Sequence, residues 1–448
     1  MTDNLASLCK HAVDLVLSFP KSTRIRVISH YDADGITSAG IICSALYAKG
    51  YDFHATLMRN PFTKGFDRLK NENNDLVIFS DMGSGQIDDI EQLNSPVIIL
   101  DHHQHLRAEV QKKIIQINAN LCGIDGNYEA CGASLSYAFA TALDPRNESL
   151  APLAIAGMMG DKQYIGGIRG YNREIVESAV NKGIVKKIIG AKLAGDTLAE
   201  SLSFSIDPYY KGLSGKEEEV KTILKKLNID SSIKIEDLDE KQRKTLHSYL
   251  LYLLVKNGCQ KNIIDIAIRE RYSSEKFGEL EQFADLLDAC GKNGARSLGL
   301  FLCLGDTKTF HEAKTVEKDY KQKILSSLLA LENDGIHEMN SFRYFYSDDS
   351  SLGGVIGGVA VNYIFDEKKA LFSLARKDDE IHVSCRGNQM LVKKGLDLGS
   401  AMKTIGEELS GYGGGHKIAA GATIGINHEK EFLEKVDALL SHQLKVNA

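Results

Sequence analysis

Carboxylates and imidazoles recur at four places in the first part of the chain, each time where a patterned segment ends. The groups, in chain order, are His30, Asp32 and Asp34; Asp81; Asp101, His102 and His103; and Asp161. Carboxylate oxygens and imidazole nitrogens together suit Mn²⁺, Mg²⁺ or Zn²⁺. So many ligands suit two ions, about 3.5–4 Å apart and sharing a carboxylate, which together activate water and steady an in-line phosphoryl displacement.

Continuous apolar runs stand before or beside most of these groups and must position them. The runs are Arg24–Ser29, Asp75–Ser80, Ser95–Leu100 and Lys113–Asn118. Such runs, alternating with helical stretches, predict buried parallel strands in a doubly wound α/β sheet. Ligands bind beyond the carboxyl ends of strands in such a sheet, so the groups are expected to converge there. We expect His30, Asp32 and Asp34 to share one face because alternate residues of an extended segment point the same way.

Each group also has a simpler interpretation. An Asp at a strand end is commonly a helix N-cap or a turn residue. A histidine pair such as His102–His103 is commonly a surface or capping feature. The coincidence of all the groups at successive element ends favours a shared metal site over these separate interpretations.

A second group of residues suited to binding an anion lies near the C-terminus. It comprises Ser384, Arg386, Gly413, Gly414, Gly415 and His416. The glycines predict a turn free of side chains, where backbone N–H groups can approach an anion. The serine and arginine add a hydroxyl and a guanidinium fork suited to phosphate. Glycine clusters also form simple tight turns, so this pattern by itself leaves both interpretations open.

The remaining segments predict the rest of the architecture. From about residue 214 to about 335, stretches rich in Lys and Glu with a helical period predict a helical middle region. Afterwards the segments 369–377 and 380–387 predict a hairpin joined by Asp378 and Asp379, followed by a helix over 398–409. The first stretch, 1–19, predicts an amphipathic helix rather than a signal peptide.

Composition limits the classes of protein. Of 448 residues, 43% are hydrophobic and 25% charged, as in an ordinary soluble protein. The net charge of −6 means that any site for a polyanion must be a local basic cleft. Eight cysteines without a C-x-x-C pair argue against a structural zinc site and predict free thiols in a reducing cytoplasm. No apolar run approaches the ~20 residues that cross a bilayer, so we expect no membrane contact.

Taken in order, these motifs resemble those of the DHH phosphoesterases. The H-x-D-x-D-G segment His30–Gly35, Asp81, the Asp101-His102-His103 triplet and Gly160-Asp161 look like that family's four motifs. The GGGH segment followed by Ala419-Ala420-Gly421 resembles the C-terminal domain of the RecJ-like branch. The resemblance implies a DHH phosphoesterase domain over residues 1–205, a helical middle region over 206–335, and a smaller α/β substrate-binding domain over 336–448.

The resemblance also implies a role for each matching position. One metal ion would be held by His30, Asp32 and Asp81. The other would be held by Asp34, Asp81, His102 and Asp161, with Asp81 bridging. The implied catalytic residues are Asp81, His102, His103 and Asp161, and His103 would face the scissile phosphate. Substrate phosphate would be bound by Ser384, Arg386, Gly413, Gly414, Gly415 and His416. The implied cofactor is two Mn²⁺ ions, with Mg²⁺ as the alternative.

The chain departs from bacterial RecJ exonucleases at two points. Those proteins generally carry Asp where this chain has His30, and histidine shifts metal preference toward softer ions. No stretch resembles their additional OB-fold, and the helical middle region stands in its place. This layout resembles archaeal RecJ-like proteins, including those associated with the replicative GINS complex.

The implied function is therefore a cytoplasmic exonuclease in DNA replication or repair that hydrolyses phosphodiester bonds at the ends of single-stranded DNA, RNA or both. GINS or other replication proteins would be further partners. Two alternatives remain open. A phosphodiesterase for short oligonucleotides or cyclic dinucleotides uses the same motifs. A replication scaffold is the other alternative, although such relatives have decayed metal motifs and these are intact. A pyrophosphatase is disfavoured by the GGGH segment.

Overall fold

The computed structural model describes residues 2–58, 64–333 and 335–446. The chain forms two compact units. The first unit comprises Met1–Ile189 and Glu270–Lys318, and the second comprises Gly190–Arg269 and Asp319–Ala448. The segment 206–335 thus contributes to both units, while the three-part domain division stays a prediction.

The first unit contains the predicted parallel sheet. Its main elements are α1 (Asp3–Ser18), β1 (Ile25–His30), α2 (Ala33–Ala48), β2 (Phe53–Met58), α3 (Lys64–Asn71), β3 (Leu76–Ser80), α4 (Ile87–Ile90), β4 (Val97–Asp101), β5 (Ile114–Asn118), α5 (Gly132–Leu143), α6 (Ala151–Gly160), α7 (Gly170–Asn181), β8 (Gly278–Glu279), α12 (Leu280–Lys292) and α13 (Arg296–Leu304). Three further elements reach into the second unit: β6 (Lys186–Ala191), β7 (Ile268–Ser274) and α14 (Phe310–Asn333).

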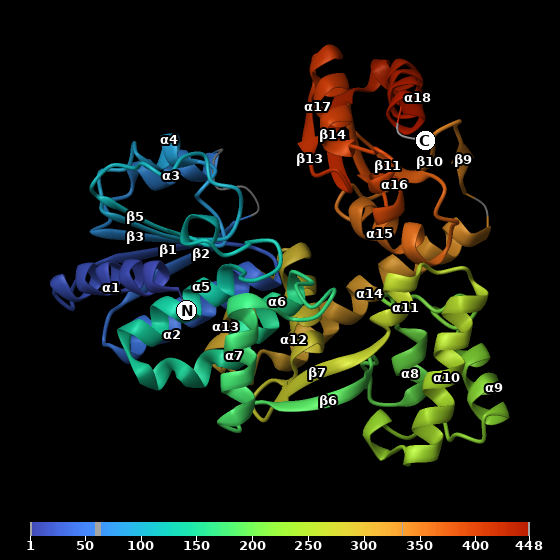
Figure 1. The fold of residues 1–448 in the computed structure, drawn as a ribbon, viewed down its shortest axis with the longest axis horizontal. Coiled ribbons are helices and arrows are strands. Elements are labelled where there is room, and N and C mark those ends of the chain that lie inside the picture. The colour runs from blue at the N-terminus through green and yellow to red at the C-terminus, as the bar shows by residue number, and fades with distance from the viewer. Residues whose placement is uncertain (1, 59–63, 334, 447–448) are drawn as a thin grey trace. The chain divides into compact units, whose positions relative to one another are not determined.

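The sheet has the strand order β2-β1-β3-β4-β5, and every neighbouring pair is parallel. Helices cover both faces, with α3 and α4 on one side and α1, α2 and α5 on the other (Figure 1). The strand order reverses between β1 and β3. In doubly wound sheets this switch point opens a crevice for ligands at the carboxyl ends of the strands, where His30 ends β1 and Asp81 follows β3.

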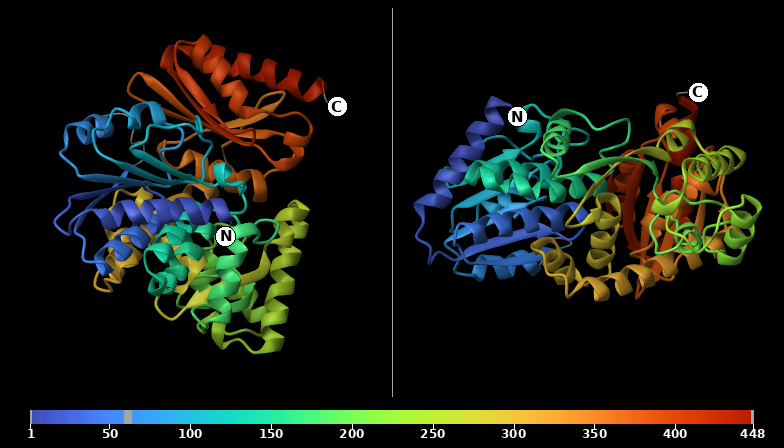
Figure 2. Two further views of the ribbon diagram at one scale, coloured as in Figure 1. Left: turned by 60° about the vertical axis from the view of Figure 1, so that its left-hand side comes forward. Right: turned by 90° about the horizontal axis from the view of Figure 1, so that it is seen from below.

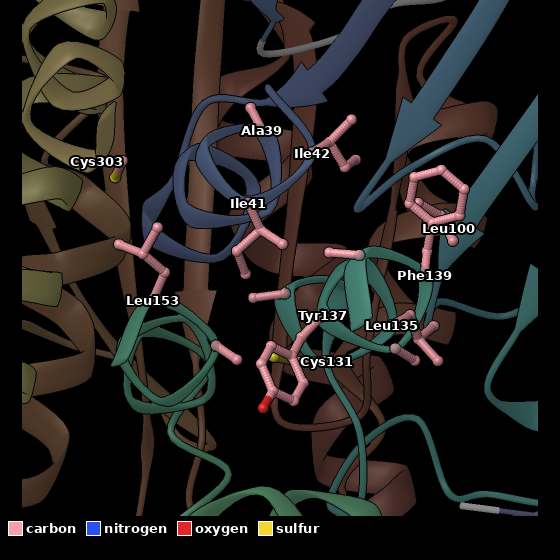
Figure 3. Close-up of a cluster of buried hydrophobic side chains, with 14 of the residues drawn as sticks. Ala39, Ile41, Ile42, Leu100, Cys131, Leu135, Tyr137, Phe139, Leu153 and Cys303 are labelled. Atoms are coloured by element: carbon pink, nitrogen blue, oxygen red, sulfur yellow. The ribbon is translucent and has the colours of Figure 1, made fainter. Parts of the chain in front are cut away.

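The core beneath the sheet is built from helices that approach closely. Figure 3 shows Phe139 of α5 beside Leu100 of β4, and Ile41 of α2 and Leu153 of α6 in the same buried cluster. The α13 helix joins this core although it lies far along the chain. A Cβ atom placed on Gly40 of α2 would come within 2.5 Å of the Cβ of Cys303. Glycine at position 40 is therefore required for α2 and α13 to pack.

Most predicted elements of the first unit are confirmed, and the exceptions have a physical reason. The four apolar runs form β1, β3, β4 and β5. The edge strand β2 was not predicted, because its segment is mostly only half-buried and lacks a continuous apolar run. Strand β7 interrupts the region predicted to be helical, because residues 268–274 pair with β6 and β8 in a small three-stranded sheet.

The second unit combines helices with a second sheet. Its remaining elements are α8 (Leu198–Ser203), α9 (Glu217–Lys226), α10 (Glu240–Lys256), α11 (Lys261–Asp265), β9 (His337–Glu338), β10 (Phe342–Tyr346), α15 (Gly353–Tyr363), β11 (Ala370–Lys377), β12 (Glu380–Arg386), α16 (Gln389–Lys393), α17 (Leu398–Glu408), β13 (Tyr412–Gly415), β14 (Ala419–Gly425) and α18 (Glu429–Val446). The hairpin β11–β12 and the helix α17 confirm the sequence predictions.

The second sheet has the order β13-β14-β12-β11-β10-β9, with β10 and β11 parallel and the other pairs antiparallel. Helices α17 and α18 cover one face, as the red elements of Figure 2 show. The prediction of a glycine-rich turn at 413–415 is wrong, since these residues form the edge strand β13. A Cβ on Gly413 would come within 2.2 Å of the Met402 carbonyl, so the glycines allow α17 to press against this strand.

All eight cysteines are free, and seven of them are buried, as the composition predicted.

Candidate metal centre

The first ligand group lies where β1 passes into α2. Asp32 is the N-cap of α2 and accepts a hydrogen bond from Gly35 N at 3.1 Å. Asp34 already lies in the first helical turn and is only 1% exposed. The expectation that these residues alternate along an extended segment is therefore wrong. Helix α2 begins so early that its first turn, rather than strand alternation, turns Asp34 inward.

Asp81 occupies the centre of the cluster. It follows β3 with a φ of 55°, a left-handed conformation uncommon for a residue with a side chain. Its carboxylate lies 3.2 Å from His102 Nε2, 3.6 Å from His30 Nδ1 and 3.8 Å from His103 Nδ1. Gly132 is required beside it, because a Cβ there would come within 2.6 Å of the Asp81 Cβ.

The side chains form three overlapping sets, and the ligand atoms of each set lie within 4.8 Å of one another. The sets are His30, Asp32 and Asp81; Asp34, His102 and Asp161; and Asp81, His102 and His103. Asp81 and His102 each belong to two sets. The structure thus brings together all six residues predicted to bind metal, from the ends of β1, β3, β4 and α6 and the start of α2.

Hydrogen bonding within the cluster is incomplete, as a cation site requires. His30 Nδ1, Asp81 Oδ1 and His102 Nε2 are buried and have no well-formed hydrogen bond. Buried polar atoms are otherwise almost always satisfied. Oxygen and nitrogen donors that converge without partners fit a divalent cation such as Mn²⁺.

The electrostatics of the carboxylates point the same way. Burial, with the charges of Asp81 and Asp161, raises the pKa of Asp34 well above its usual range. Burial also raises the pKa of Asp161 to about 7, because the opposing charge of His102 only partly offsets it. Crowded carboxylates resist ionising together, so this cluster needs compensating positive charge.

The imidazoles supply part of that charge. Burial alone would lower the pKa of His30, but Asp32 and Asp81 outweigh it and raise this pKa to about 11. Burial likewise opposes the charging of His102, yet Asp161 and Asp81 raise its pKa well above the usual value. Burial also disfavours an ionised Asp81, but the close approach of His102 and His30 holds its pKa well below the usual range. A divalent cation would displace these protons and take their place.

The Asp101 carboxylate orients the neighbouring His103 and the loop after β3. Its Oδ1 accepts from His103 Nδ1 at 2.8 Å, and its Oδ2 accepts from Ser84 N at 2.9 Å. The His103 side chain itself is 54% exposed. Asn118 Nδ2 donates to the His103 carbonyl at 2.9 Å, and Asn120 Nδ2 donates to the His102 carbonyl at 3.1 Å. Both asparagines thus brace the histidine pair.

Sequence reasoning missed a buried amide network behind His102. The Gly126 carbonyl lies 2.6 Å from His102 Nδ1 and also accepts from Gln163 Nε2 at 3.0 Å. Asn172 Nδ2 donates in turn to Gln163 Oε1, and Ser134 Oγ to Asn172 Oδ1. With Nδ1 engaged in this way, His102 presents Nε2 to the cluster. The only signal in the sequence was the position of Gln163, two residues after Asp161.

The predicted phosphate-binding residues gather in the second unit. Ser384 and Arg386 lie on β12, the three glycines on β13, and exposed His416 between β13 and β14. Burial lowers the pKa of Arg386. In the described part of the chain, no carboxylate lies within ion-pair distance of its guanidinium. An unpaired, mostly buried arginine suits an anionic ligand, and phosphate binding by these residues stays a prediction.

Three family models match parts of the chain. Residues 24–159 match the N-terminal domain of the DHH family, 342–442 match the DHHA1 domain, and 192–295 match archaeal Cdc45. The uncharacterised protein MJ0831 of Methanocaldococcus jannaschii is 30% identical over 429 residues, which cover 94% of each chain.

Solved structures share the fold at low identity. RecJ of Thermus thermophilus in complex with Mn²⁺ aligns with a TM-score of 0.61 at 17% identity, over 98% of this chain and 55% of that one. This chain therefore spans about half the length of that RecJ. Cdc45 of Entamoeba histolytica aligns with a TM-score of 0.65 at 12% identity, over 96% of this chain and 99% of that one.

Among the described helices, none is both long enough and apolar enough to span a membrane. The ordered motifs, the sheet that presents them and the two matching domain models agree. The chain is a member of the DHH family of metal-dependent phosphoesterases, with a DHHA1 domain toward its C-terminus and a fold that it shares with RecJ.

Proposed function

We propose that this protein is a two-metal exonuclease that hydrolyses phosphodiester bonds at the ends of single-stranded DNA or RNA. The observation that carries the proposal is the convergence of four carboxylates and two imidazoles on the switch point of the sheet, with the polar atoms of three of them left unsatisfied. Four carboxylates balance the charge of two divalent ions, so the occupied centre would be close to neutral toward an anionic substrate.

The ligand sets indicate how two ions would be shared. His30, Asp32 and Asp81 would hold one, and Asp34, Asp81, His102 and Asp161 the other. Two Mn²⁺ ions, or Mg²⁺ as the alternative, would supply an activated water and neutralise charge developing on the phosphate oxygens. Since Asp81 belongs to two sets, it is the residue suited to bridge the ions.

The protein's own groups would position the substrate. His103 is exposed and held by Asp101, so it would present its free ring nitrogen to the scissile phosphate. Substrate phosphate would be bound by Ser384, Arg386, Gly413, Gly414, Gly415 and His416. We further propose the division into a DHH domain (1–205), a helical middle region (206–335) and a substrate-binding domain (336–448).

The proposed setting is DNA replication or repair in the cytoplasm. The free, largely buried cysteines support a reducing compartment. The archaeal Cdc45 match over 192–295 supports association with replication proteins such as GINS.

The test is digestion of end-labelled single strands in the presence of Mn²⁺, using long and short DNA and RNA labelled at either end. Degradation of the long strands is expected, and it would reveal polarity and sugar preference. Cleavage of short strands alone would instead identify an oligonucleotide phosphodiesterase. The Asp81→Asn protein controls for contaminating nucleases.

A non-catalytic replication scaffold is the second candidate, favoured by the archaeal Cdc45 match. The complete ligand set argues against it, since a scaffold has no need to keep six convergent ligands. Metal binding without cleavage of any strand, together with capture of replication proteins, would establish the scaffold instead.

A further inference from the structure

We propose that the open face of the second sheet around Tyr412 binds a nucleobase of the substrate strand, next to the phosphate held by Arg386. This inference rests on the proposed function and adds to it a site for the base. The favoured substrate is then a strand with a base that can stack on Tyr412, rather than an isolated phosphate ester.

Strand register places the relevant residues on one face. Tyr412 of β13 pairs with Thr423 of β14, which pairs with His382 of β12. Ser384 and Arg386 follow His382 at alternate positions, so their side chains point to the same side. The intervening residues of β12 and β14 point the other way and belong to the core covered by α17 and α18.

Helix α15 packs against Ser384 and Arg386 on this side of β12, whereas the row of β13 and β14 that follows Tyr412 and Thr423 carries only glycines. Gly414 and Gly421 pair in the same row as Ser384. A Cβ on Gly414 would meet no atom within 4 Å, so the space above it is open. Tyr412 stands at the edge of this glycine floor with 66% of its surface exposed. An exposed aromatic ring beside a flat floor is the arrangement on which single-stranded bases stack.

The two ends of this face carry opposite charges. Arg386, at one end of β12, has no acidic partner among the described residues. Glu380 stands at the other end, with its side chain 56% exposed and 3.9 Å from His382. A phosphate is attracted to the arginine and repelled from the glutamate. The Tyr412 end therefore suits an uncharged base, while the Arg386 end suits the phosphate.

The experiment measures equilibrium binding of 5′-phosphorylated single strands by fluorescence anisotropy, in Asp81→Asn protein so that hydrolysis does not interfere. Tyr412→Ala is expected to weaken binding about tenfold, because stacking on one aromatic ring is lost. Tyr412→Phe keeps the ring and should bind like the parent. Tyr252→Ala, which alters an exposed tyrosine on α10 of the same unit, is the matched control.

Strands carrying one abasic site at successive positions locate the contact. At one position, loss of the base should weaken binding to the parent protein. For that strand, the Tyr412→Ala substitution should cause no further loss of affinity. Binding by Tyr412→Ala within twofold of the parent would overturn the proposal. The proposal would also be overturned if Tyr412→Phe bound the strand as weakly as Tyr412→Ala does. It would be overturned as well if Tyr412→Ala bound more weakly than the parent at every position of the abasic site.

Hydrolysis assays separate this inference from the proposed function. If binding depends on Tyr412 but the wild-type protein hydrolyses no strand, the base-binding site is supported and the exonuclease proposal is rejected. If the wild-type protein hydrolyses long strands but Tyr412→Ala binds them with unchanged affinity, the exonuclease proposal is supported and the base-binding site is rejected.

Discussion

At the scale of single residues, Asp81 combines burial, an uncommon backbone conformation and contact with several histidines. It is 2% exposed, takes a positive φ and lies within reach of three histidines. Strain of this kind is retained at functional positions when the surroundings fix it. Its carboxylate is the group whose loss we expect to affect both ions.

Asp81→Asn should lower activity more than about 100-fold, the upper end of the loss for outer-shell partners of metal ligands. Asn tolerates the left-handed conformation, so the variant should keep the native fold. Metal content by mass spectrometry and circular dichroism complete the measurement. Near wild-type activity in Asp81→Asn or Asp81→Ala would remove Asp81 from the bridging role.

Gln163 tests whether the amide network orients His102. Gln163→Leu removes the donor to the Gly126 carbonyl and should weaken Mn²⁺ binding about 10- to 100-fold by calorimetry. The control is Gln116→Leu, since Gln116 is also buried but its amide atoms have no hydrogen bond. Equal Mn²⁺ affinity in both variants would show that the network is structural only.

The raised pKa values predict how pH affects the metal-free protein. The folded pKa of Asp161, about 7, lies above the unfolded value of 3.8, so its stabilisation is lost as pH rises between them. The contribution of His30 is complete below 6.5 and is lost as pH rises toward about 11. The melting temperature without metal should therefore fall from about pH 5 to about pH 9. Bound Mn²⁺ should reduce this fall in melting temperature. The Asp161→Asn substitution should remove the part of the fall that occurs below about pH 7. A melting temperature that rises over this range would contradict the assignment.

At the scale of elements, the N-termini of helices help to position the side chains that follow the strands. The first N–H groups of α5, from Gly132 and Ala133, donate to Asp34 at 2.7 and 2.9 Å. An anion at a helix N-terminus is favoured by these unsatisfied donors and by the helix dipole. Helix α5 therefore holds Asp34 in place and also needs glycine to come so close.

Two glycine substitutions separate close packing from helix propensity. Gly132→Ala would place a Cβ within 2.6 Å of the Asp81 Cβ and 2.9 Å of Asp34 Oδ2, so it should destabilise by about 1–3 kcal/mol and reduce metal binding. Gly358→Ala, in α15, meets no atom within 4 Å and should stabilise by about 0.5–1 kcal/mol. Urea unfolding measures both. Equal effects of the two substitutions would show that α5 can retreat from the site.

At the scale of the whole molecule, the predicted metal ligands and the predicted phosphate ligands belong to different units. The six predicted metal ligands are in the first unit, while Ser384, Arg386 and the glycine strand are in the second. Substitutions in the second unit should therefore change substrate affinity without changing the metal content of the first.

Arg386→Ala should raise KM at least tenfold, since a charge-assisted hydrogen bond contributes about 1.5–3 kcal/mol, and leave bound Mn²⁺ unchanged. Arg376→Ala is the matched control, because Arg376 lies on the neighbouring strand and is already paired with Glu429 at 2.8 Å. Steady-state kinetics and metal analysis are the measurements. Loss of metal in Arg386→Ala, or equal KM values in the two variants, would contradict the phosphate-binding role.

Local patterns in the sequence were enough to predict the strands that are buried on both faces and the candidate ligands at their ends. Mostly apolar runs identify β1, β3, β4 and β5 because strands buried on both faces are rich in apolar residues, and the predicted metal ligands stand out as acidic residues and histidines at or just after their ends. The hairpin β11–β12 was equally readable from its alternation and its Asp378–Asp379 turn. These features are local, so neighbouring residues are enough to specify them.

Features that depend on partners far away in the chain became visible only in the folded protein. Asp34 turns inward because α2 begins early and α5 donates to it, and Gln163 matters because it meets Gly126. The glycines at 413–415 form a strand because β14 pairs with them and α17 packs against them. Half-buried β2 is a strand because it pairs with β1. Pairing and close packing between segments far apart in the chain leave no local pattern, and therefore the fold had to supply them.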